Sequence, residues 1–143
     1  IIGVKESGPD LAQVGELIRA TPDEFQVLVG SAPTFYPSLC LGAIGGILAL
    51  AGVVPELCVK LFKLTTAGQH VEALNLQQRL TPLARQVTSS YGVGGLKAAM
   101  DIVGYVGGQP RKPLPQIPSE GFEQVRKQLE LLTKMSHSSG SSE

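Results

Sequence analysis

The chain has 143 residues, of which 43% are hydrophobic and 17% are charged, and its formal net charge is zero. This composition is typical of a soluble globular protein with a hydrophobic core, and it lacks the basic excess that a nucleic-acid-binding surface needs. The longest apolar stretch, residues 43–54, is too short to cross a bilayer. We therefore expect neither a nucleic acid nor a membrane as a partner.

The first half of the chain alternates between strand-like and helix-like segments. In chain order, the pattern predicts a strand at residues 1–7, a helix opened by residues 8–10 and stopped at 21–23, a strand at 25–29, a helix at 32–41, a strand at 43–51 and a helix from Pro55. The third strand is wholly apolar, as expected of a strand that is buried on both faces. This βαβαβα order is typical of parallel units, either in a doubly wound sheet or in a (β/α) barrel.

From residue 69 onwards only helices are predicted. In order, the pattern indicates a long helix with a kink at Pro82, a helix whose apolar stripe runs from Leu96 to Val106, an extended linker at residues 107–118, a helix from about Phe122 to Leu132, and a disordered polar tail. The chain is thus divided into three βα units (residues 1–67), a helical extension (68–135) and the tail (136–143).

Cys40 and Cys58 are the only cysteines. Both fall in apolar helical patterns, so they are interpreted as free buried thiols, with a disulfide as the less favoured alternative. The chain has no pair of cysteines at a metal-binding spacing, so no metal site is expected.

The strand at residues 1–7 carries a lysine where its apolar neighbours predict a buried side chain. Alternation places Gly3, Lys5 and Ser7 on one face. In a (β/α) barrel that face points into the lumen, and Lys5 and Ser7 then lie at the carboxyl end of the strand, where barrel active sites are built. Desolvation at that position favours the neutral amine, a nucleophile that can attack a ketone and form a Schiff base. The alternative is an edge lysine paired with Glu6, although adjacent residues on a strand face opposite ways.

Two other strand ends carry residues that suit a binding site. Gly30 and Ser31 offer a backbone N–H and a hydroxyl, although Ser31 also suits the N-cap of the following helix. Gly45 and Gly46 interrupt the third strand, which indicates either close approach of a ligand to the main chain or tight packing.

Several motifs, taken in their order, resemble the dihydrodipicolinate synthase / N-acetylneuraminate lyase family. They are "IIGVKES", "GPDLAQV", "VLVGSA", "LGAIGGILALAGVVPEL" and "AGQHVEALNLQQRLTPL", and the resemblance runs from Ile1 to about Leu114. It implies an α/β fold made of the last three βα units of a (β/α)8 TIM barrel and a C-terminal helical extension, usually assembled as a homotetramer.

The resemblance also implies the chemistry. Lys5 matches the catalytic Schiff-base lysine of class I aldolases and lyases that act on pyruvate-type 2-keto acids without a metal or an organic cofactor. Ser7 matches a position that, in one branch, helps to bind the distal end of the substrate. Gly30 and Ser31 match the strand end that lines the pocket, and Ile47 matches the position whose backbone faces the bound pyruvate unit.

Within the family, "KESGPD", "VLVGSA" and "GLKAAMDIVGYVGG" are most similar to the 4-hydroxy-2-oxoglutarate aldolase branch, which is mitochondrial in animals and would otherwise be cytoplasmic. That branch cleaves 4-hydroxy-2-oxoglutarate to pyruvate and glyoxylate. Synthases of the family usually carry two acidic residues where this chain has Ser31 and Ala32. A dihydrodipicolinate synthase, a 2-keto-3-deoxy sugar acid aldolase, or a non-catalytic truncated or regulatory chain are the alternatives.

The resemblance places two further parts of the family's site upstream of Ile1: a proton-relay tyrosine and a Thr/Ser pair that grips the substrate carboxylate. We therefore expect that the chain begins in the middle of a fold and that it is inactive alone, since general acid–base help is worth about 10²–10⁴-fold in rate.

Overall fold

The computed structural model describes residues 1–138 and divides into two compact units. The first comprises residues 1–78, and the second begins at Arg79. The division falls inside helix α4 (His70–Arg85). The domain boundary expected after residue 67 stays a prediction about the chain's organisation, and each unit is described below by itself.

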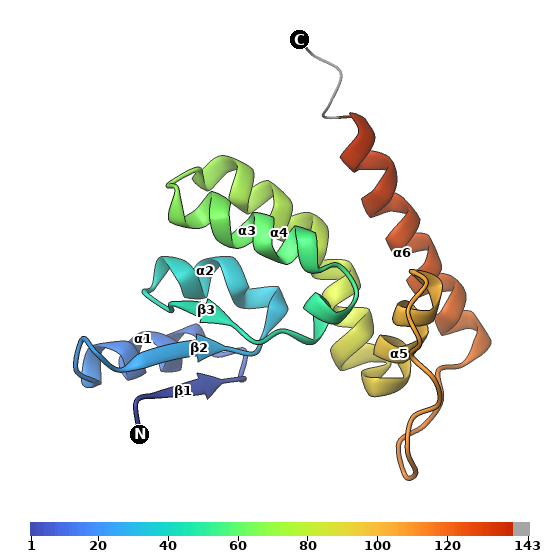
Figure 1. The fold of residues 1–143 in the computed structure, drawn as a ribbon, viewed down its shortest axis with the longest axis horizontal. Helices are drawn as coiled ribbons and strands as arrows, with labels where there is room; N and C mark the ends of the chain where they lie inside the picture. Colours follow the sequence, from blue (N-terminus) through green and yellow to red (C-terminus); the bar gives the residue numbers. More distant parts are fainter. Residues whose placement is uncertain (139–143) are drawn as a thin grey trace. The chain divides into compact units, whose positions relative to one another are not determined.

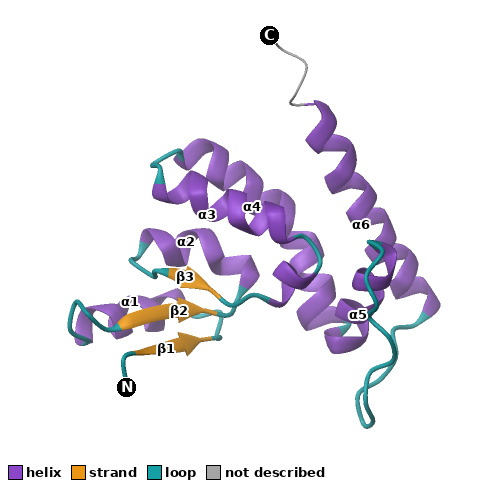
Figure 2. Ribbon diagram, viewed as in Figure 1, coloured by secondary structure: helices purple, strands orange, loops and turns teal. Residues whose placement is uncertain are grey.

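The first unit consists of the predicted βα repeats, labelled in Figure 1. Its elements are β1 (Gly3–Glu6), α1 (Leu11–Ala20), β2 (Gln26–Val29), a 3-10 turn (Ala32–Thr34), α2 (Phe35–Cys40), β3 (Gly45–Gly46), a second 3-10 turn (Ala49–Gly52), α3 (Pro55–Thr66) and the start of α4. The three strands form one parallel sheet in the order β1-β2-β3, with their arrowheads pointing the same way in Figure 2. Their carboxyl ends therefore meet at one edge of the sheet.

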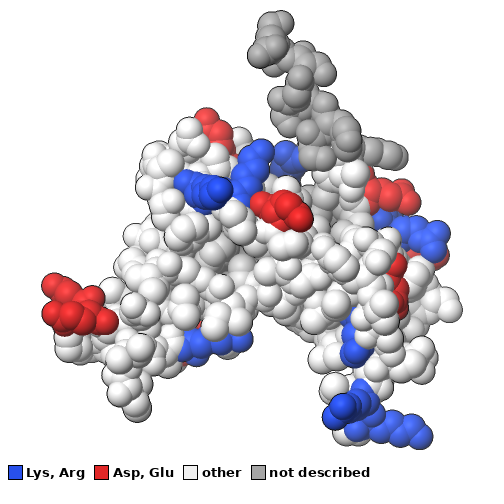
Figure 3. All heavy atoms as spheres, in the orientation of Figure 1, with Lys and Arg blue, Asp and Glu red and all other residues white. Residues whose placement is uncertain are grey.

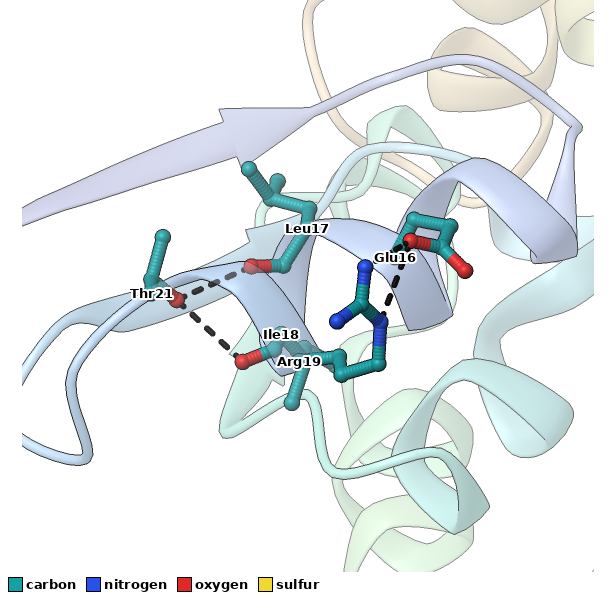
Figure 4. A network of polar contacts seen from close by, with 5 residues as sticks. All are labelled: Glu16, Leu17, Ile18, Arg19 and Thr21. Carbon is teal, nitrogen blue, oxygen red and sulfur yellow. Dashed lines mark hydrogen bonds and ion pairs between the residues drawn. The ribbon is translucent and has the colours of Figure 1, made fainter.

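At the end of helix α1, the side chain of the next residue hydrogen-bonds to two of the last carbonyl groups. The Thr21 hydroxyl donates to the carbonyls of Leu17 at 2.9 Å and Ile18 at 3.4 Å, as drawn in Figure 4. These bonds satisfy acceptors that the end of a helix leaves without intrahelical partners. The nearby Arg19–Glu16 ion pair, at 2.7 Å, is exposed and contributes little to stability.

The third strand is much shorter than predicted. A strand was expected over residues 43–51, but β3 comprises only Gly45–Gly46 and is followed by the turn Ala49–Gly52. The N–H groups of Ile44 and Ile47 still donate to β2 carbonyls, at 3.0 and 2.9 Å, so the pairing extends one residue to each side. Burial on both faces is also wrong for the described residues, because Ile44 and Ile47 are half exposed.

Both outer strands leave apolar side chains exposed. On the β1 side, Ile2 is 81% and Val4 38% exposed, and beside β3, Ile44 is 50% and Ile47 55% exposed. Three parallel strands with two free edges are expected to leave such a surface, which in a larger sheet would be covered.

Gln77 is a buried polar residue of α4 that holds the segment after β2. Its Oε1 accepts the N–H of Tyr36 at 2.9 Å, and its Nε2 donates to the carbonyl of Ala32 at 3.1 Å. Because Gln77 is only 5% exposed, water has little access to these groups. The side chain therefore satisfies one backbone donor and one backbone acceptor at the start of α2.

We predict that Gln77→Leu lowers the free energy of unfolding by about 1–2 kcal/mol, because it leaves the Tyr36 N–H without its partner and removes one of the two donors to the Ala32 carbonyl, which still accepts the Phe35 N–H. Urea denaturation followed by circular dichroism measures the change. The matched control is Gln78→Leu, an exposed position on the same helix, which should stay within about 0.5 kcal/mol of the wild type. Equal losses in the two variants would contradict the role given to Gln77.

The two cysteines are free, but they differ in burial. Cys58 is buried as predicted, whereas Cys40, at the end of α2, is exposed, so the prediction of a buried thiol is wrong there. The apolar pattern of a short helix did not show which face its last residue takes. Burial raises the pKa of the Cys58 thiol to about 11, and the neighbouring Glu56 carboxylate acts in the same direction.

The second unit contains only helical elements within the described residues. They are the remainder of α4, one π-helical turn (Gln86–Ser90), α5 (Gly92–Ile102) and α6 (Ser119–Ser138). Its core is made of apolar side chains from all of these elements, among them Leu80, Leu83, Ala84, Val87, Ala98, Ala99, Val125, Leu129 and Leu132. Pro82 lies inside α4, and the helix continues through it to Arg85. The kink expected at Pro82 stays a prediction.

Helix α5 ends earlier than its apolar stripe suggests. The stripe was expected to continue to Val106, but the helix stops at Ile102 and Val106 is 92% exposed. The reason is a glycine cap: Gly104 has φ of +91°, its N–H donates to the carbonyl of Asp101 at 3.2 Å, and the N–H of Tyr105 donates to that of Met100 at 2.9 Å.

The segment between α5 and α6 is irregular, as predicted for residues 107–118, and contains a cis peptide bond between Lys112 and Pro113. Of the polar tail expected at residues 136–143, the first three residues end α6, and residues 139–143 lie outside the described part of the chain. Within residues 1–138, no helix combines the length and the apolar character that a membrane span requires.

Candidate functional site

The site residues predicted from sequence lie together at the carboxyl edge of the sheet. In the register of the strands, Glu6 lies opposite Val29, and Val29 opposite Gly46. One step further along each strand are Ser7, Gly30 and Ile47, so these three positions form the next row across the sheet. The N–H of Gly30 donates to the Glu6 carbonyl at 2.7 Å, and that of Ile47 to the Val29 carbonyl at 2.9 Å, which continues the ladder to this row.

Lys5 and Ser7 converge over Gly30. A Cβ atom built on Gly30 would lie 2.8 Å from Cε of Lys5 and 2.9 Å from Cβ of Ser7, and closer still to the Ser7 hydroxyl. Both side chains therefore occupy the space that any larger residue at this position would fill. This places the lysine beside the hydroxyl of Ser7, as the alternation of the strand predicts.

In the described sheet Lys5 does lie on an edge strand, β1, but the alternative pairing of Lys5 with Glu6 is wrong. The Glu6 carboxylate instead accepts the N–H of Gly8 at 2.6 Å and the side-chain amide of Gln13 at 3.0 Å. The expected desolvation of Lys5 is also absent from this chain, because Lys5 is exposed. The physical reason is that three strands provide only part of the wall that a closed barrel places around its lumen.

The groups offered by Gly30 and Ser31 differ from the expectation. The Gly30 N–H is used in the ladder, so it is not a free donor for a ligand. Ser31 occupies the N-cap position of the 3-10 turn Ala32–Thr34, but its hydroxyl makes no capping hydrogen bond. The Ser31 carbonyl accepts the N–H of Thr34 at 3.3 Å. Because the Ser31 hydroxyl makes no capping bond, it is available to a ligand at the site edge.

At Gly46 the structure favours the packing interpretation. A Cβ atom there would lie 2.9 Å from the Phe35 ring and 3.0 Å from the Leu48 side chain. Ile47 uses its backbone N–H in the sheet, so of its main-chain polar groups only the carbonyl remains as a candidate contact for a ligand. His70 lies elsewhere, on α4, with Nδ1 3.3 Å from the Tyr36 hydroxyl.

Two features of the site were not found from sequence. One is the steric role of Gly30, and the other is the set of hydrogen bonds made by Glu6. A carboxylate two residues before a glycine is a signal for such a turn, but only the structure shows which donors reach it.

Charged side chains give no sign of a polyanion-binding face in the view of Figure 3, where basic and acidic groups lie in small separate clusters. Among the residues that the structure describes, no three His, Cys, Asp or Glu side chains are placed so as to hold a metal ion.

Comparison with known proteins identifies the relatives of this arrangement. Residues 1–132 match the model of the Dihydrodipicolinate synthetase family. The 4-hydroxy-tetrahydrodipicolinate synthase of Archaeoglobus fulgidus is 34% identical over 136 residues, which cover 95% of this chain and 47% of that protein. The one from Methanopyrus kandleri is 35% identical over 132 residues, with 92% and 44% coverage. Among solved structures, the 4-hydroxy-tetrahydrodipicolinate synthase of Methylacidiphilum fumariolicum SolV matches with a TM-score of 0.85 at 30% identity, covering 96% of this chain and 47% of that chain.

The chain therefore spans about half the length of the relatives it matches. The likeness confirms the predicted α/β fold, part of a (β/α) barrel followed by helices. It does not support the 4-hydroxy-2-oxoglutarate aldolase branch, since the relatives above carry the name of a synthase.

Proposed function

The chain belongs to the dihydrodipicolinate synthetase family, and from that membership we propose that it supplies the Schiff-base lysine of a pyruvate-dependent carbon–carbon lyase or synthase. One observation carries the proposal: Lys5 and Ser7 converge over Gly30 at the carboxyl edge of a parallel sheet. Barrel enzymes place their chemistry at this edge.

In the proposed reaction, the neutral amine of Lys5 attacks the C2 carbonyl of pyruvate or of a longer 2-keto acid. Loss of water from the carbinolamine gives a protonated imine, which acts as an electron sink. In the synthetic direction, loss of a C3 proton gives an enamine whose C3 attacks the carbonyl carbon of an aldehyde; the aldehyde oxygen takes up a proton, and water then releases the product from the lysine. In the cleavage direction, the C4 hydroxyl gives up its proton as the C3–C4 bond breaks, the aldehyde leaves, the enamine regains a proton at C3, and water releases pyruvate from the lysine. Neither direction requires a metal or an organic cofactor.

A neutral amine requires an enclosed site, and the described residues leave Lys5 exposed. We propose that the remaining wall is formed by the βα units found in the other half of the relatives' length, which would also provide the proton-relay tyrosine and the carboxylate-binding Thr/Ser pair. The exposed apolar side chains along β1 and β3 suit packing against such units.

For the second substrate, a synthase that adds aspartate semialdehyde to pyruvate is the better supported candidate, because the curated relatives carry that name. A 4-hydroxy-2-oxoglutarate aldolase is the second candidate. It is favoured by Ser31 and Ala32, which stand where synthases of the family usually have two acidic residues. A panel of aspartate semialdehyde, glyoxylate and sugar aldehydes, each with pyruvate, separates these activities.

The covalent step is tested in the active protein, with those further βα units present, by treating it with pyruvate and borohydride and mapping the adduct by peptide mass spectrometry. We expect the reduced adduct at Lys5 and not at surface lysines such as Lys60 and Lys63, which serve as internal controls. Lys5→Arg keeps the positive charge but should lose the adduct. Labelling that is absent, or equal at all lysines, would overturn the proposed function and leave the non-catalytic alternative.

A further inference from the structure

Glu6 makes three hydrogen bonds that converge on the proposed site. Its carboxylate accepts the N–H of Gly8 at 2.6 Å through Oε1 and the side-chain amide of Gln13 at 3.0 Å through Oε2. Its backbone carbonyl accepts the N–H of Gly30 at 2.7 Å. A charged acceptor makes the stronger kind of hydrogen bond, so this set is expected to hold its position.

The hydrogen bond from the Gly8 N–H to the Glu6 carboxylate closes a turn that contains Ser7. The next residues are fixed as well, because Gln13 belongs to the first turn of α1 and that turn is capped by Asp10, whose carboxylate accepts the N–H groups of Ala12 at 2.8 Å and Gln13 at 3.3 Å. The backbone at Ser7 is therefore held from both sides.

On the opposite side of the strand, the hydroxyl of Ser7 lies over Gly30 next to the Lys5 side chain. Glu6 thus holds the turn at Ser7 through its carboxylate. Through its backbone carbonyl it also holds Gly30, over which the Ser7 side chain lies.

We propose that Glu6 is a positioning residue: its carboxylate closes the turn after β1 and sets the Ser7 hydroxyl beside Lys5, where it contacts the part of the substrate beyond the pyruvate unit. This inference rests on the proposed function for its catalytic meaning. It assigns Glu6 no contact with the reacting atoms.

The positioning itself is tested on the chain by NMR. Glu6→Met keeps about the length of the side chain but provides no oxygen that could accept from Gly8 or Gln13. We expect amide exchange at Gly8 to become about tenfold faster, since one hydrogen bond is worth about 1.4 kcal/mol. The couplings between Hα and Hβ of Ser7 should change from those of one rotamer to an average. Glu6→Gln is the conservative variant: its amide oxygen can accept the N–H of Gly8 and its NH2 can donate to Gln13 once the Gln13 amide turns over, so it should restore most of both signals.

The catalytic consequence is tested in the active protein. Glu6→Met should raise the KM of the substrate that reaches beyond the pyruvate unit, the aldehyde of a synthase or the longer 2-keto acid of an aldolase, about tenfold, while borohydride trapping of pyruvate at Lys5 stays unchanged, because pyruvate lacks the distal part. In a Ser7→Ala background the same substitution should add nothing, since the two residues act through one contact. The conservative variant Glu6→Gln should recover most of the KM.

Unchanged Gly8 exchange and Ser7 couplings in Glu6→Met overturn the inference, as does a KM effect that persists without the Ser7 hydroxyl. Loss of trapping together with the KM effect would also overturn it, because Glu6 would then act on Lys5 or on the fold. If the wild type shows no adduct at Lys5, the proposed function fails, and the NMR signals alone decide whether Glu6 positions Ser7.

Discussion

Replacing Gly30 with alanine should slow the trapping of pyruvate at Lys5 by about 100-fold, because a displacement of the order of 1 Å in a reacting group has an effect of this size. The new methyl group would lie 2.8 Å from Cε of Lys5 and 2.9 Å from Cβ of Ser7, so both side chains must move. The rate is measured by quantitative mass spectrometry of the borohydride-reduced adduct at Lys5.

The same substitution should have a smaller effect on the stability of the fold. Gly30 does not have a positive φ, so an alanine fits its backbone, and the Ser7 hydroxyl and the Lys5 side chain can rotate away. Cβ of Ser7 moves only with its backbone, so the end of β1 must shift, and we expect the free energy of unfolding to fall by about 1–2 kcal/mol.

Gly15→Ala is the matched control for Gly30→Ala. Gly15 lies inside α1 with open space where its Cβ would be, so trapping should be unaffected and the helix should gain about 0.5–1 kcal/mol. Trapping at the wild-type rate in Gly30→Ala would show that the position of the lysine does not depend on this residue.

Gly107→Ala should have the largest effect on stability, a loss of about 2–3 kcal/mol. Its Cβ would lie 2.7 Å from the carbonyl carbon and 3.0 Å from the Cα of Lys97, and would overlap the carbonyl oxygen. These are backbone atoms in the middle of α5, which cannot move aside. If the loop moved instead, it would lose the bond from the Gly107 N–H to the Asp101 carboxylate at 2.8 Å and the bond from the Lys97 ammonium to the Gly107 carbonyl.

The neighbouring glycine provides the comparison. Gly108 has φ of +67° and open space around its Cβ position, so Gly108→Ala should cost only the backbone strain, about 1 kcal/mol. Urea denaturation of both variants measures the difference. A loss at Gly107 no greater than at Gly108 would mean that the close approach to α5 is not what requires glycine there.

The position of the site at the strand ends was predictable from sequence, whereas its detailed contacts were not. The two-residue period of a strand is enough to put Lys5 and Ser7 on one face, and the βα order is enough to bring Gly30 and Ile47 to the same edge. The sequence pattern could not reveal features that depend on distances in three dimensions. These are the space that Gly30 leaves for both side chains, and the hydrogen bond of Glu6 to Gly8 and not to Lys5.

The elements of the fold were likewise predictable where local sequence determines them, and less so where contacts between distant segments do. Hydrophobic period found α1 close to its observed bounds and α3 at its observed start, because α1 has a clear cap and α3 an opening proline. The third strand was overestimated, since an apolar run does not reveal how many neighbours a strand will have. Similarly, the stripe that continued past Ile102 did not outweigh the glycine at residue 104, whose positive φ ends the helix.

The continuity of α4 has a consequence for the design of chimeric proteins. A cut at the division after residue 78 would sever one helix in its middle, whereas the turn between Thr66 and His70 is a natural joint. A graft made at that joint would transfer Gln77 with the incoming helices, while its hydrogen-bond partners at Ala32 and Tyr36 stay with the recipient. Exchange of the helical extension between relatives therefore requires a glutamine, or an equivalent donor and acceptor, at this one position of the donor segment.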